Sequence, residues 1–473
     1  MNDNRRGFIK KAGMASAFSL LPASGIFANG IRTDEKKGIP IPTKAQQMWQ
    51  DLEVGVIFHL DISILEGEYS PNNYSKKVFD PQSYNPSKLD TDQWVRAAKA
   101  AGAKYAIFTG THFNGFMQWQ SDLYPYGLKQ SPWRDGKGDI FGDFVASCRK
   151  EGIEPGIYIS TCRNFYQCVL ENYVDWGSGK GTEKQGIFNR VAEKMTEEIC
   201  SKYGELVQIW YDSGVKLPHE GGPDVLPIFE KYQPNSIFYN SSKRSDYRWV
   251  GNEDGYARYP CWATMPAADN ESHTGDRWKP LLDTGDPNGE IWSPAMVDIP
   301  LRGANGVHNW FWNPNEEHGV HSTKKLVEMY YNSVGRNSNF VIGAVITPEG
   351  LVPDLDVARL KEFGDEIERR FSNPLVTSSG SGKRLDINAL DKQKVNQVVL
   401  TEDISKGERV RQFRVEGKTA KGWKVLAEGS CIGHKYIARF DEVEVSSIKL
   451  EVTESIANPI IREFSIYHYC GMQ

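Results

Sequence analysis

The segment Val54-Gly55-Val56-Ile57-Phe58-His59 is apolar up to a closing imidazole, and it predicts a buried strand. A helix is expected next over residues 92–101, followed by a second strand at 105–109. The alternation continues, with strands expected at 155–160, 206–211, 236–240, 292–299, 308–312 and 340–346, and helices at 139–150, 189–203, 226–232, 324–333 and 356–371. This order is typical of a mainly parallel sheet covered by helices.

These strand positions number eight within residues 41–371, which predicts an α/β fold of the (β/α)8 TIM-like barrel type with insertions. A doubly wound open sheet is the alternative. It is disfavoured because no glycine-rich turn of the phosphate-binding kind follows the first strand. In a barrel, the active site is expected at the carboxyl ends of the strands.

A different pattern begins after Ser372. Residues 377–382 are rich in Ser and Gly and predict a linker. Short strands are expected beyond it, at 395–400, 409–416, 423–429, 436–440, 446–453 and 460–469. Because no long helix interrupts them, they predict a jelly-roll-like β-sandwich domain over residues 377–473. Both a sugar-binding role and a role in bracing the barrel remain open for this domain.

Residues 1–28 have the order of an export signal. Asn4-Arg5-Arg6-Gly7-Phe8 opens it, a small and apolar run follows over 12–21, and residues 22–28 offer a cleavage zone. The arginine pair resembles a twin-arginine signal, and an ordinary secretory signal is the alternative. The apolar run is too short to span a bilayer. We therefore expect an exported protein, either periplasmic or at the cell surface.

Charge and cysteine content argue against several classes of protein. The 56 basic and 61 acidic residues give a net charge of −5, without the positive surplus that nucleic-acid binding requires. The seven cysteines include no CxxC pair and predict neither a zinc cage nor a dense disulfide framework. Aromatic residues make up 12% of the chain, which suits either a large core or a site that packs flat rings against sugars.

Four polar residues lie in or directly after successive strands. His59 ends the first strand, His112 follows the second, Tyr158 lies in the third and Asp212 ends the fourth. One polar residue at a strand end is often structural, but four on successive strands favour a functional reading. Because the carboxyl ends of barrel strands meet at one face, we expect these side chains to lie together.

Asp212 is the strongest candidate for a catalytic group, because it follows Trp210-Tyr211 and precedes small residues that let a substrate approach. An N-cap is its alternative role. A retaining glycosidase also needs a second carboxyl group, about 5–5.5 Å away, that protonates the leaving oxygen. Glu253 is our choice, since the Gly-flanked loop 249–256 gives it aromatic neighbours, and Glu290 is the reserve.

Residues 49–371 resemble glycoside hydrolase family 29, the α-L-fucosidases, and lie closer to its branch for α-1,3/1,4 linkages. The resemblance rests on Gly55-Val56-Ile57-Phe58-His59, Ala101-Gly102-Ala103-Lys104-Tyr105, His112 with Gly115-Phe116, Trp119-Gln120-Ser121, Gly156-Ile157-Tyr158-Ile159-Ser160, Trp210-Tyr211-Asp212 and Ser333-Val334-Gly335-Arg336. It implies a retaining exo-glycosidase that removes terminal α-L-fucosyl residues from oligosaccharides or glycoconjugates, with an accessory β domain. It implies no metal or organic cofactor.

The resemblance also implies roles for single residues. The family's nucleophile falls on Asp212, and the Gly-Asn-Glu loop that supplies the acid/base in that branch falls on Glu253. The candidates for contact with the sugar are His59, His112, Glu68, Tyr69, Tyr158, Trp210 and Trp312. Met296-Val297-Asp298-Ile299 and Trp310-Phe311-Trp312 resemble the late barrel segments of the same branch.

Departures from the family pattern bear on the choice of sugar. The usual His-Trp-Gly is here His59-Leu60-Asp61, the usual Glu-Trp is Glu68-Tyr69, and one imidazole has become Phe113. A pocket built to bond a hydroxyl group discriminates against sugars that lack it. Phe113 and the new carboxylate Asp61 therefore suggest a shifted sugar, such as L-galactose or a modified fucose. A catalytically weak, sugar-binding relative is the other alternative.

Overall fold

The computed structural model describes residues 38–69, 76–267, 276–306 and 308–469. The expected export signal, residues 1–28, lies outside the described residues. Among the helices that are described, none combines the length and the apolar character that crossing a membrane requires.

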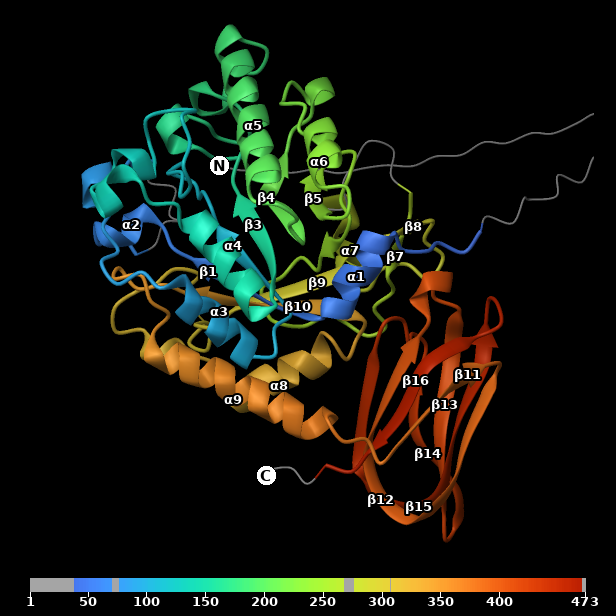
Figure 1. Cartoon of the computed structure of the whole chain (residues 1–473). Helices are drawn as coiled ribbons and strands as arrows, with labels where there is room; N and C mark the ends of the chain where they lie inside the picture. The colour runs from blue at the N-terminus through green and yellow to red at the C-terminus, as the bar shows by residue number, and fades with distance from the viewer. Residues whose placement is uncertain (1–37, 70–75, 268–275, 307, 470–473) are drawn as a thin grey trace, which may run out of the picture. The chain divides into compact units, whose positions relative to one another are not determined.

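The first part of the described chain is a TIM-like barrel built on one sheet of eight parallel strands (Figure 1). In sheet order the strands are β5 (Ile237–Ser241), β4 (Gln208–Val215), β3 (Glu154–Ile159), β2 (Tyr105–Thr109), β1 (Val54–His59), β10 (Ser338–Val345), β9 (Ala295–Pro300) and β6 (Arg248–Trp249). The expected fold class is confirmed.

Helices accompany the strands of this sheet. They are α1 (Lys44–Leu52), α2 (Ile62–Leu65), α3 (Thr91–Ala100), α4 (Ile140–Glu151), α5 (Glu183–Lys202), α6 (Leu226–Tyr232), α7 (Lys279–Leu282), α8 (Thr323–Asn332) and α9 (Asp354–Phe371). Helices α3 and α4 pack directly against the sheet. Local signals set several of their ends. Asp90 and Asp139 accept hydrogen bonds from the first turns of α3 and α4, and Gly152 ends α4 in the left-handed conformation.

The side chains of β1 alternate between two cores. Val56 and Phe58 pack toward the helices, whereas Ile57 packs into the barrel interior with Tyr105 and other buried aromatic residues. A Cβ atom on Gly55 would collide with the ring of Tyr105, so glycine at this position lets that ring fill the barrel. The barrel interior is therefore packed with side chains at the level of Gly55.

The second part is a sheet domain of six antiparallel strands in the order β11-β16-β12-β15-β13-β14. The strands are β11 (Val376–Ser381), β12 (Arg384–Glu402), β13 (Val410–Thr419), β14 (Gly422–Gly429), β15 (Tyr436–Ser455) and β16 (Ile460–Tyr467). The long strands β12 and β15 pair with each other across two register shifts, and the sheet encloses its own core around Val398, Phe413 and Phe464. A separate pair, β7 (Thr264–Met265) and β8 (Ile291–Trp292), lies in a barrel loop.

Three details of the sequence prediction were wrong. Residues 377–382 are largely strand β11 rather than a linker, because their alternating side chains pair with β16. Residues 436–440 and 446–453 belong to one strand, β15. Residues 308–312 form no strand. Strand β9 pairs directly with β10, and the eighth strand of the sheet is the two-residue β6 on the other side of β9.

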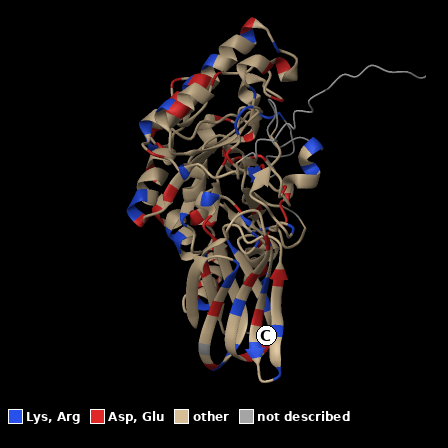
Figure 2. Cartoon of the chain, turned by 90° about the vertical axis from the view of Figure 1, so that its right-hand side faces the viewer, with Lys and Arg blue, Asp and Glu red and all other residues tan. Residues whose placement is uncertain are grey.

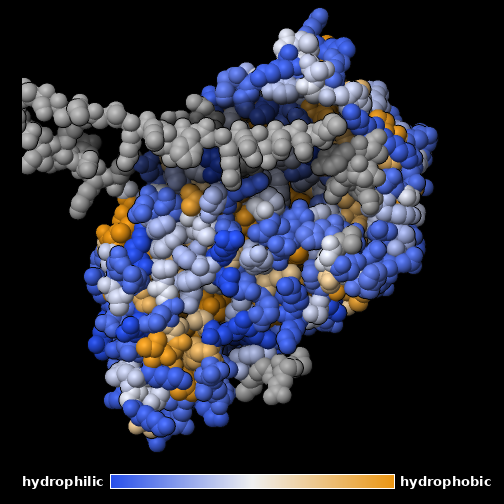
Figure 3. All heavy atoms as spheres, turned by 180° about the vertical axis from the view of Figure 1, so that it is seen from behind, coloured by the Kyte–Doolittle hydropathy of each residue, from blue (hydrophilic) through white to orange (hydrophobic). Residues whose placement is uncertain are grey.

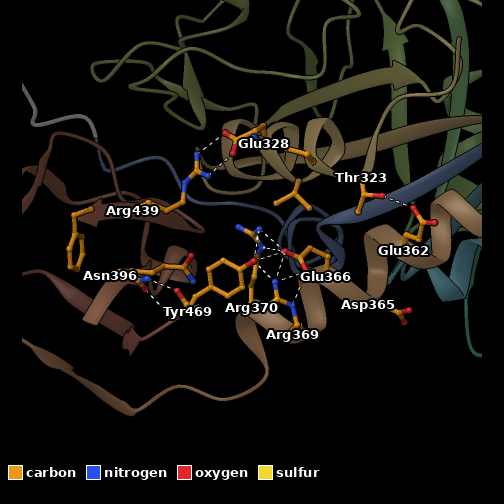
Figure 4. Close-up of a pocket in the computed structure, with 14 residues that line it drawn as sticks. Thr323, Glu328, Glu362, Asp365, Glu366, Arg369, Arg370, Asn396, Arg439 and Tyr469 are labelled. Atoms are coloured by element: carbon orange, nitrogen blue, oxygen red, sulfur yellow. Dashed lines mark hydrogen bonds and ion pairs between the residues drawn. The ribbon is translucent and has the colours of Figure 1, made fainter. Parts of the chain in front are cut away.

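Ion pairs connect the barrel helices with the β domain. Arg439 of β15 makes two contacts with Glu328 of α8, at 2.6 and 2.7 Å. Figure 4 shows these side chains beside a cavity of about 760 Å³, in which Arg369 and Arg370 of α9 converge on Glu366 and Tyr469. On the other side of the junction, Asp51 contacts His434 at 2.9 Å and Arg462 at 3.0 Å.

Lys and Arg are interspersed with Asp and Glu over both parts of the chain (Figure 2). Seen from behind, the surface is mostly hydrophilic, with an apolar patch over the β domain (Figure 3). The exposed apolar side chains of this domain include Trp423 and Val425 of β14, which is an edge strand.

Candidate active site

A cavity of about 320 Å³ opens at the carboxyl ends of the barrel strands. It is lined by Ile57, His59, His112, Phe113, Tyr158, Arg163, Trp210, Asp212, Ser213, Glu253, Asp298, Trp310 and Phe311. Seven of these residues are candidates from the sequence: both carboxyl groups, His59, His112, Phe113, Tyr158 and Trp210. The cavity therefore brings together selected candidates that are as many as 194 positions apart, from His59 to Glu253.

Asp212 lies within β4 and is half-buried in the cavity wall. The hydroxyl group of Tyr158 on the neighbouring strand donates a hydrogen bond to Oδ2 of Asp212 at 2.8 Å. Burial raises the pKa of Asp212, and the charge of Glu253 adds to this rise, whereas the Tyr158 hydrogen bond and the charge of Arg163 favour the carboxylate. Tyr158 and Arg163 thus offset the cost of holding a negative charge here.

The backbone after Asp212 takes an unusual turn. Ser213 has a φ of 57° and Gly214 a φ of 79°, so two successive residues are in the left-handed region. A Cβ atom on Gly214 would collide with the side chain of Asn240 on β5. Glycine is therefore required at position 214 on both counts.

Glu253 lies in the loop that follows β6, on the wall of the same cavity. Gly251 and Gly255, with φ values of 85° and 77°, flank it in conformations that favour glycine. The indole of Trp310 donates to Oε2 of Glu253 at 2.9 Å, and Nδ1 of His308 lies 3.0 Å from the same oxygen. The carboxyl group is about one-third exposed, so it faces the cavity mouth.

His59 and His112 are buried and neutral. Burial lowers the pKa of His59 to about 3 and that of His112 well below its usual value. The Nδ1 atoms of both rings are buried without a hydrogen-bond partner among the described residues. A buried polar atom without a partner is costly, so these two atoms are an unusual feature of the cavity wall.

Aromatic rings form the apolar walls between these polar atoms. Phe113 stacks on His112 with ring centroids 3.9 Å apart, and Phe311 meets His112 edge-on at 4.8 Å. The Arg163 guanidinium lies over the other part of this wall, 4.5 Å from the centroid of Phe113. Alternating polar atoms and flat apolar faces are what recognition of a sugar ring requires.

The sequence-based selection missed Asp298, although its segment had been noticed. Asp298 lies on β9 in the cavity wall, and its Oδ1 accepts a hydrogen bond from the Trp249 indole at 2.8 Å. Burial raises the pKa of Asp298 well above its usual value, and the charges of Glu253 and Asp212 act in the same direction. The signal that could have identified Asp298 is a single carboxyl group in an otherwise apolar strand.

Arg163, Ser213, Trp310 and Phe311 also line the cavity and were not among the selected candidates. Trp310 and Phe311 are adjacent to the selected Trp312, and Arg163 follows the end of β3. The choice of Trp312 was therefore close in sequence but fell on a residue outside the cavity lining.

The remaining candidates do not line this cavity. Asp61 is buried and caps α2 through the backbone of Ser63 at 2.9 Å, while it accepts two hydrogen bonds from the Asn114 amide at 2.7 and 2.8 Å. Tyr69 packs edge-on against Trp312, with ring centroids 5.4 Å apart. Glu68, which precedes Tyr69 in the sequence, is partly exposed. The reserve candidate Glu290 is exposed and directly precedes β8.

Comparison with known proteins identifies the family. The sequence profile described as Alpha-L-fucosidase matches residues 43–370, which is most of the barrel. The chain belongs to the alpha-L-fucosidase family. It is 28% identical to Alpha-L-fucosidase 1 of Arabidopsis thaliana, over 91% of this chain and 88% of that protein.

Solved structures agree with this assignment. A candidate alpha-L-fucosidase from Bacteroides thetaiotaomicron is 44% identical and superimposes with a TM-score of 0.87, covering 91% of this chain and all of that one. A glycoside hydrolase 29 family member from an unknown rumen bacterium is 28% identical with a TM-score of 0.78, covering 93% and 79% of the two chains. The chain is therefore a glycoside hydrolase of family 29, and a glycan is its substrate.

A metal site is not apparent in the part of the chain that the structure describes. No group of three or more His, Cys, Asp or Glu side chains there is arranged to hold an ion. The chemistry available in the cavity is that of its carboxyl groups, imidazoles and phenol.

Proposed function

We propose that the protein is an exo-acting, retaining α-L-fucosidase in which Asp212 is the nucleophile and Glu253 is the general acid/base. The observation that carries the proposal is that these two carboxyl groups lie on the wall of one small cavity, beside two neutral imidazoles and several aromatic rings. A retaining glycosidase needs two carboxyl groups on opposite sides of the scissile bond.

In the first step, an oxygen of Asp212 attacks the anomeric carbon while the bond to the leaving oxygen breaks. Glu253 gives its proton to that oxygen, so the aglycone departs as a neutral alcohol. The Tyr158 hydrogen bond holds the Asp212 carboxylate in place for the attack. The product is a glycosyl ester on Asp212, and Glu253 is left as a carboxylate.

In the second step, Glu253 removes a proton from a water molecule while the oxygen of that water attacks the anomeric carbon. The ester bond to Asp212 breaks, the sugar leaves with its original anomeric configuration, and Glu253 is again protonated. The position of Glu253 toward the mouth of the cavity suits both tasks, because the aglycone leaves and the water enters from there.

For the sugar itself, α-L-fucose is the glycone we propose. Of the two residues that suggested a shifted sugar, Asp61 has its carboxylate engaged by Ser63 and Asn114 and lies outside the lining, so only Phe113 faces the cavity. Phe113, Trp210 and Phe311 all line the cavity, and their apolar faces offer places for the 6-methyl group. The Gly-Asn-Glu context of Glu253 supports a preference for α-1,3/1,4 linkages.

We also propose that the protein is exported. The order of basic, apolar and small residues within positions 1–28 is the support for this proposal. Edman sequencing of the protein secreted by its host would test it, with a mature N-terminus near residue 28 expected and an intact Met1 contradicting it.

Azide rescue tests the assignment of the two carboxyl groups. Asp212→Gly should lose activity on an aryl α-L-fucoside, and azide should restore turnover and yield the β-L-fucosyl azide, because azide replaces Asp212 on its face of the ring. Glu253→Ala with azide should instead yield the α-azide, since azide attacks the ester on Asp212. Asp254→Asn, next to Glu253 but outside the cavity lining, is the matched control. An initial β-anomeric product from wild type would overturn the mechanism.

A further inference from the structure

Two nitrogen atoms converge on a single oxygen of Glu253. Nε1 of Trp310 and Nδ1 of His308 lie 2.9 and 3.0 Å from Oε2, whereas no hydrogen bond to Oε1 is found among the described residues. An indole N–H can only donate, so Oε2 is an acceptor toward Trp310 whatever the state of the carboxyl group. The His308 tautomer that carries its proton on Nδ1 fills the second lone pair of that oxygen.

We propose that His308 is a positioning residue that, together with Trp310, keeps Oε2 of Glu253 occupied as an acceptor, so that the catalytic proton is carried on Oε1. This inference rests on the proposed role of Glu253 as the acid/base. A carboxylic acid has one proton, and either of its two oxygens can carry it. Occupying one oxygen therefore decides which of them presents the proton to the departing alcohol and later accepts the proton of water.

The segment that carries His308 is anchored at its base. The amide of Asn309 donates to the carbonyl of Arg302 at 3.0 Å, and the two residues form an antiparallel bridge. Arg302 is itself fully buried and makes three contacts with Asp356 of α9, at 2.9 to 3.2 Å. A rigid base of this kind fixes where the imidazole can lie relative to Glu253.

The electrostatic surroundings make this hydrogen bond useful. Asp212 and Asp298 interact unfavourably with a charged Glu253 across the cavity, whereas Arg163 lies on the side of Asp212. On its own side of the cavity, Glu253 therefore depends on His308 and Trp310 for stabilisation of the carboxylate that forms when its proton leaves.

Leaving-group dependence is the test. His308→Leu removes the donor, and His308→Asn places an amide N–H near the position of Nδ1. His318→Asn, at an exposed histidine of the same loop, is the control. On phenyl α-L-fucoside, which needs protonation, we expect His308→Leu to lose at least about tenfold in kcat/KM. On 2,4-dinitrophenyl α-L-fucoside, which leaves unaided, we expect near wild-type formation of the ester. His308→Asn should recover most of the loss.

The pH profile supplies a second readout. Without the His308 donor the carboxylate is less stabilised, so the basic limb of kcat/KM for His308→Leu should move to higher pH, and that of His308→Asn should stay in place. Equal losses on both substrates, or no loss on either, would overturn the inference. Glu253→Gln, measured alongside, separates the two proposals: if it shows no leaving-group dependence, then Glu253 is not the acid. If Glu253→Gln shows leaving-group dependence and His308→Leu does not, then Glu253 is the acid and only the inference about His308 fails.

Discussion

The hydroxyl group of Tyr158 lies 2.8 Å from Oδ2 of Asp212, and this hydrogen bond connects the neighbouring third and fourth strands of the barrel at the cavity wall. Tyr158 is buried and its own pKa is raised well above the usual value by burial and by the charge of Asp212. It is therefore a permanent donor, and its hydrogen bond favours the ionised form of the carboxyl group that the proposed mechanism needs.

Tyr158→Phe removes this donor without changing the ring. We expect kcat to fall about 10- to 100-fold, because a hydrogen bond to a charged group contributes about 1.5–3 kcal/mol. Loss of the donor also raises the pKa of Asp212 further, so the acidic limb of kcat/KM should move to higher pH. An unchanged acidic limb would show that Tyr158 does not stabilise the Asp212 carboxylate. Tyr166→Phe, at a tyrosine outside the cavity lining, is a suitable control.

Asp298 provides a second test, based on stability. In the unfolded chain, Asp298 releases its proton as the pH rises above its usual pKa of 3.8. Because burial raises the pKa of Asp298, the folded protein keeps that proton to a higher pH. Stability is thus lost as the pH rises from the usual value toward the folded pKa. Asp298→Asn keeps the shape and needs no proton, so its Tm should fall less than that of wild type between pH 5 and pH 8. A parallel decline in both proteins would mean that Asp298 is ionised in the fold.

The alternation of β1 explains which site residues the sequence could predict. Ile57 and His59 face the cavity, whereas Phe58 packs toward the helices. His59 could thus be selected from the strand end alone. Asp61 could not be placed in this way, because the strand has ended and the chain turns into α2, where the carboxylate serves as a cap. Its location depends on Asn114, which lies 53 positions away.

Residues that reach the site from long loops were harder to predict. Trp310 and Phe311 line the cavity although their segment is not a strand, so a run of aromatic residues suggested regular structure where there is none. Strand β6 is only two residues long and gives no period-two signal, yet its place beside β9 brings the Glu253 loop to the cavity. Such positions follow from sheet order, which local sequence does not encode.

The junction between barrel and β domain offers a prediction on acid stability. Burial alone would raise the pKa of Asp51, but hydrogen bonds from His434 and Arg462 outweigh it and hold the value at about 2. The stabilisation is therefore present above the unfolded value of about 3.8 and is lost as the pH falls through about 2. Asp51 is partly exposed, so Asp51→Asn should cost less than about 1 kcal/mol at pH 7 in urea unfolding. The cost should vanish near pH 2, and a cost that persists there would contradict the ion-pair account.

Gly55→Ala tests the packing that supports the site from below. A methyl group at this position would meet the ring of Tyr105 inside the barrel, and an overpacked core typically loses about 1–3 kcal/mol. Because Gly55 and His59 lie on the same strand and the same face, a shift of β1 would also displace His59. We therefore expect a lower free energy of unfolding together with a raised KM. Gly38→Ala, where nothing lies within 4 Å of the added atom, should change neither quantity. If Gly55→Ala matched Gly38→Ala in both measurements, the barrel interior would be looser than these contacts indicate, and the position of His59 would not depend on it.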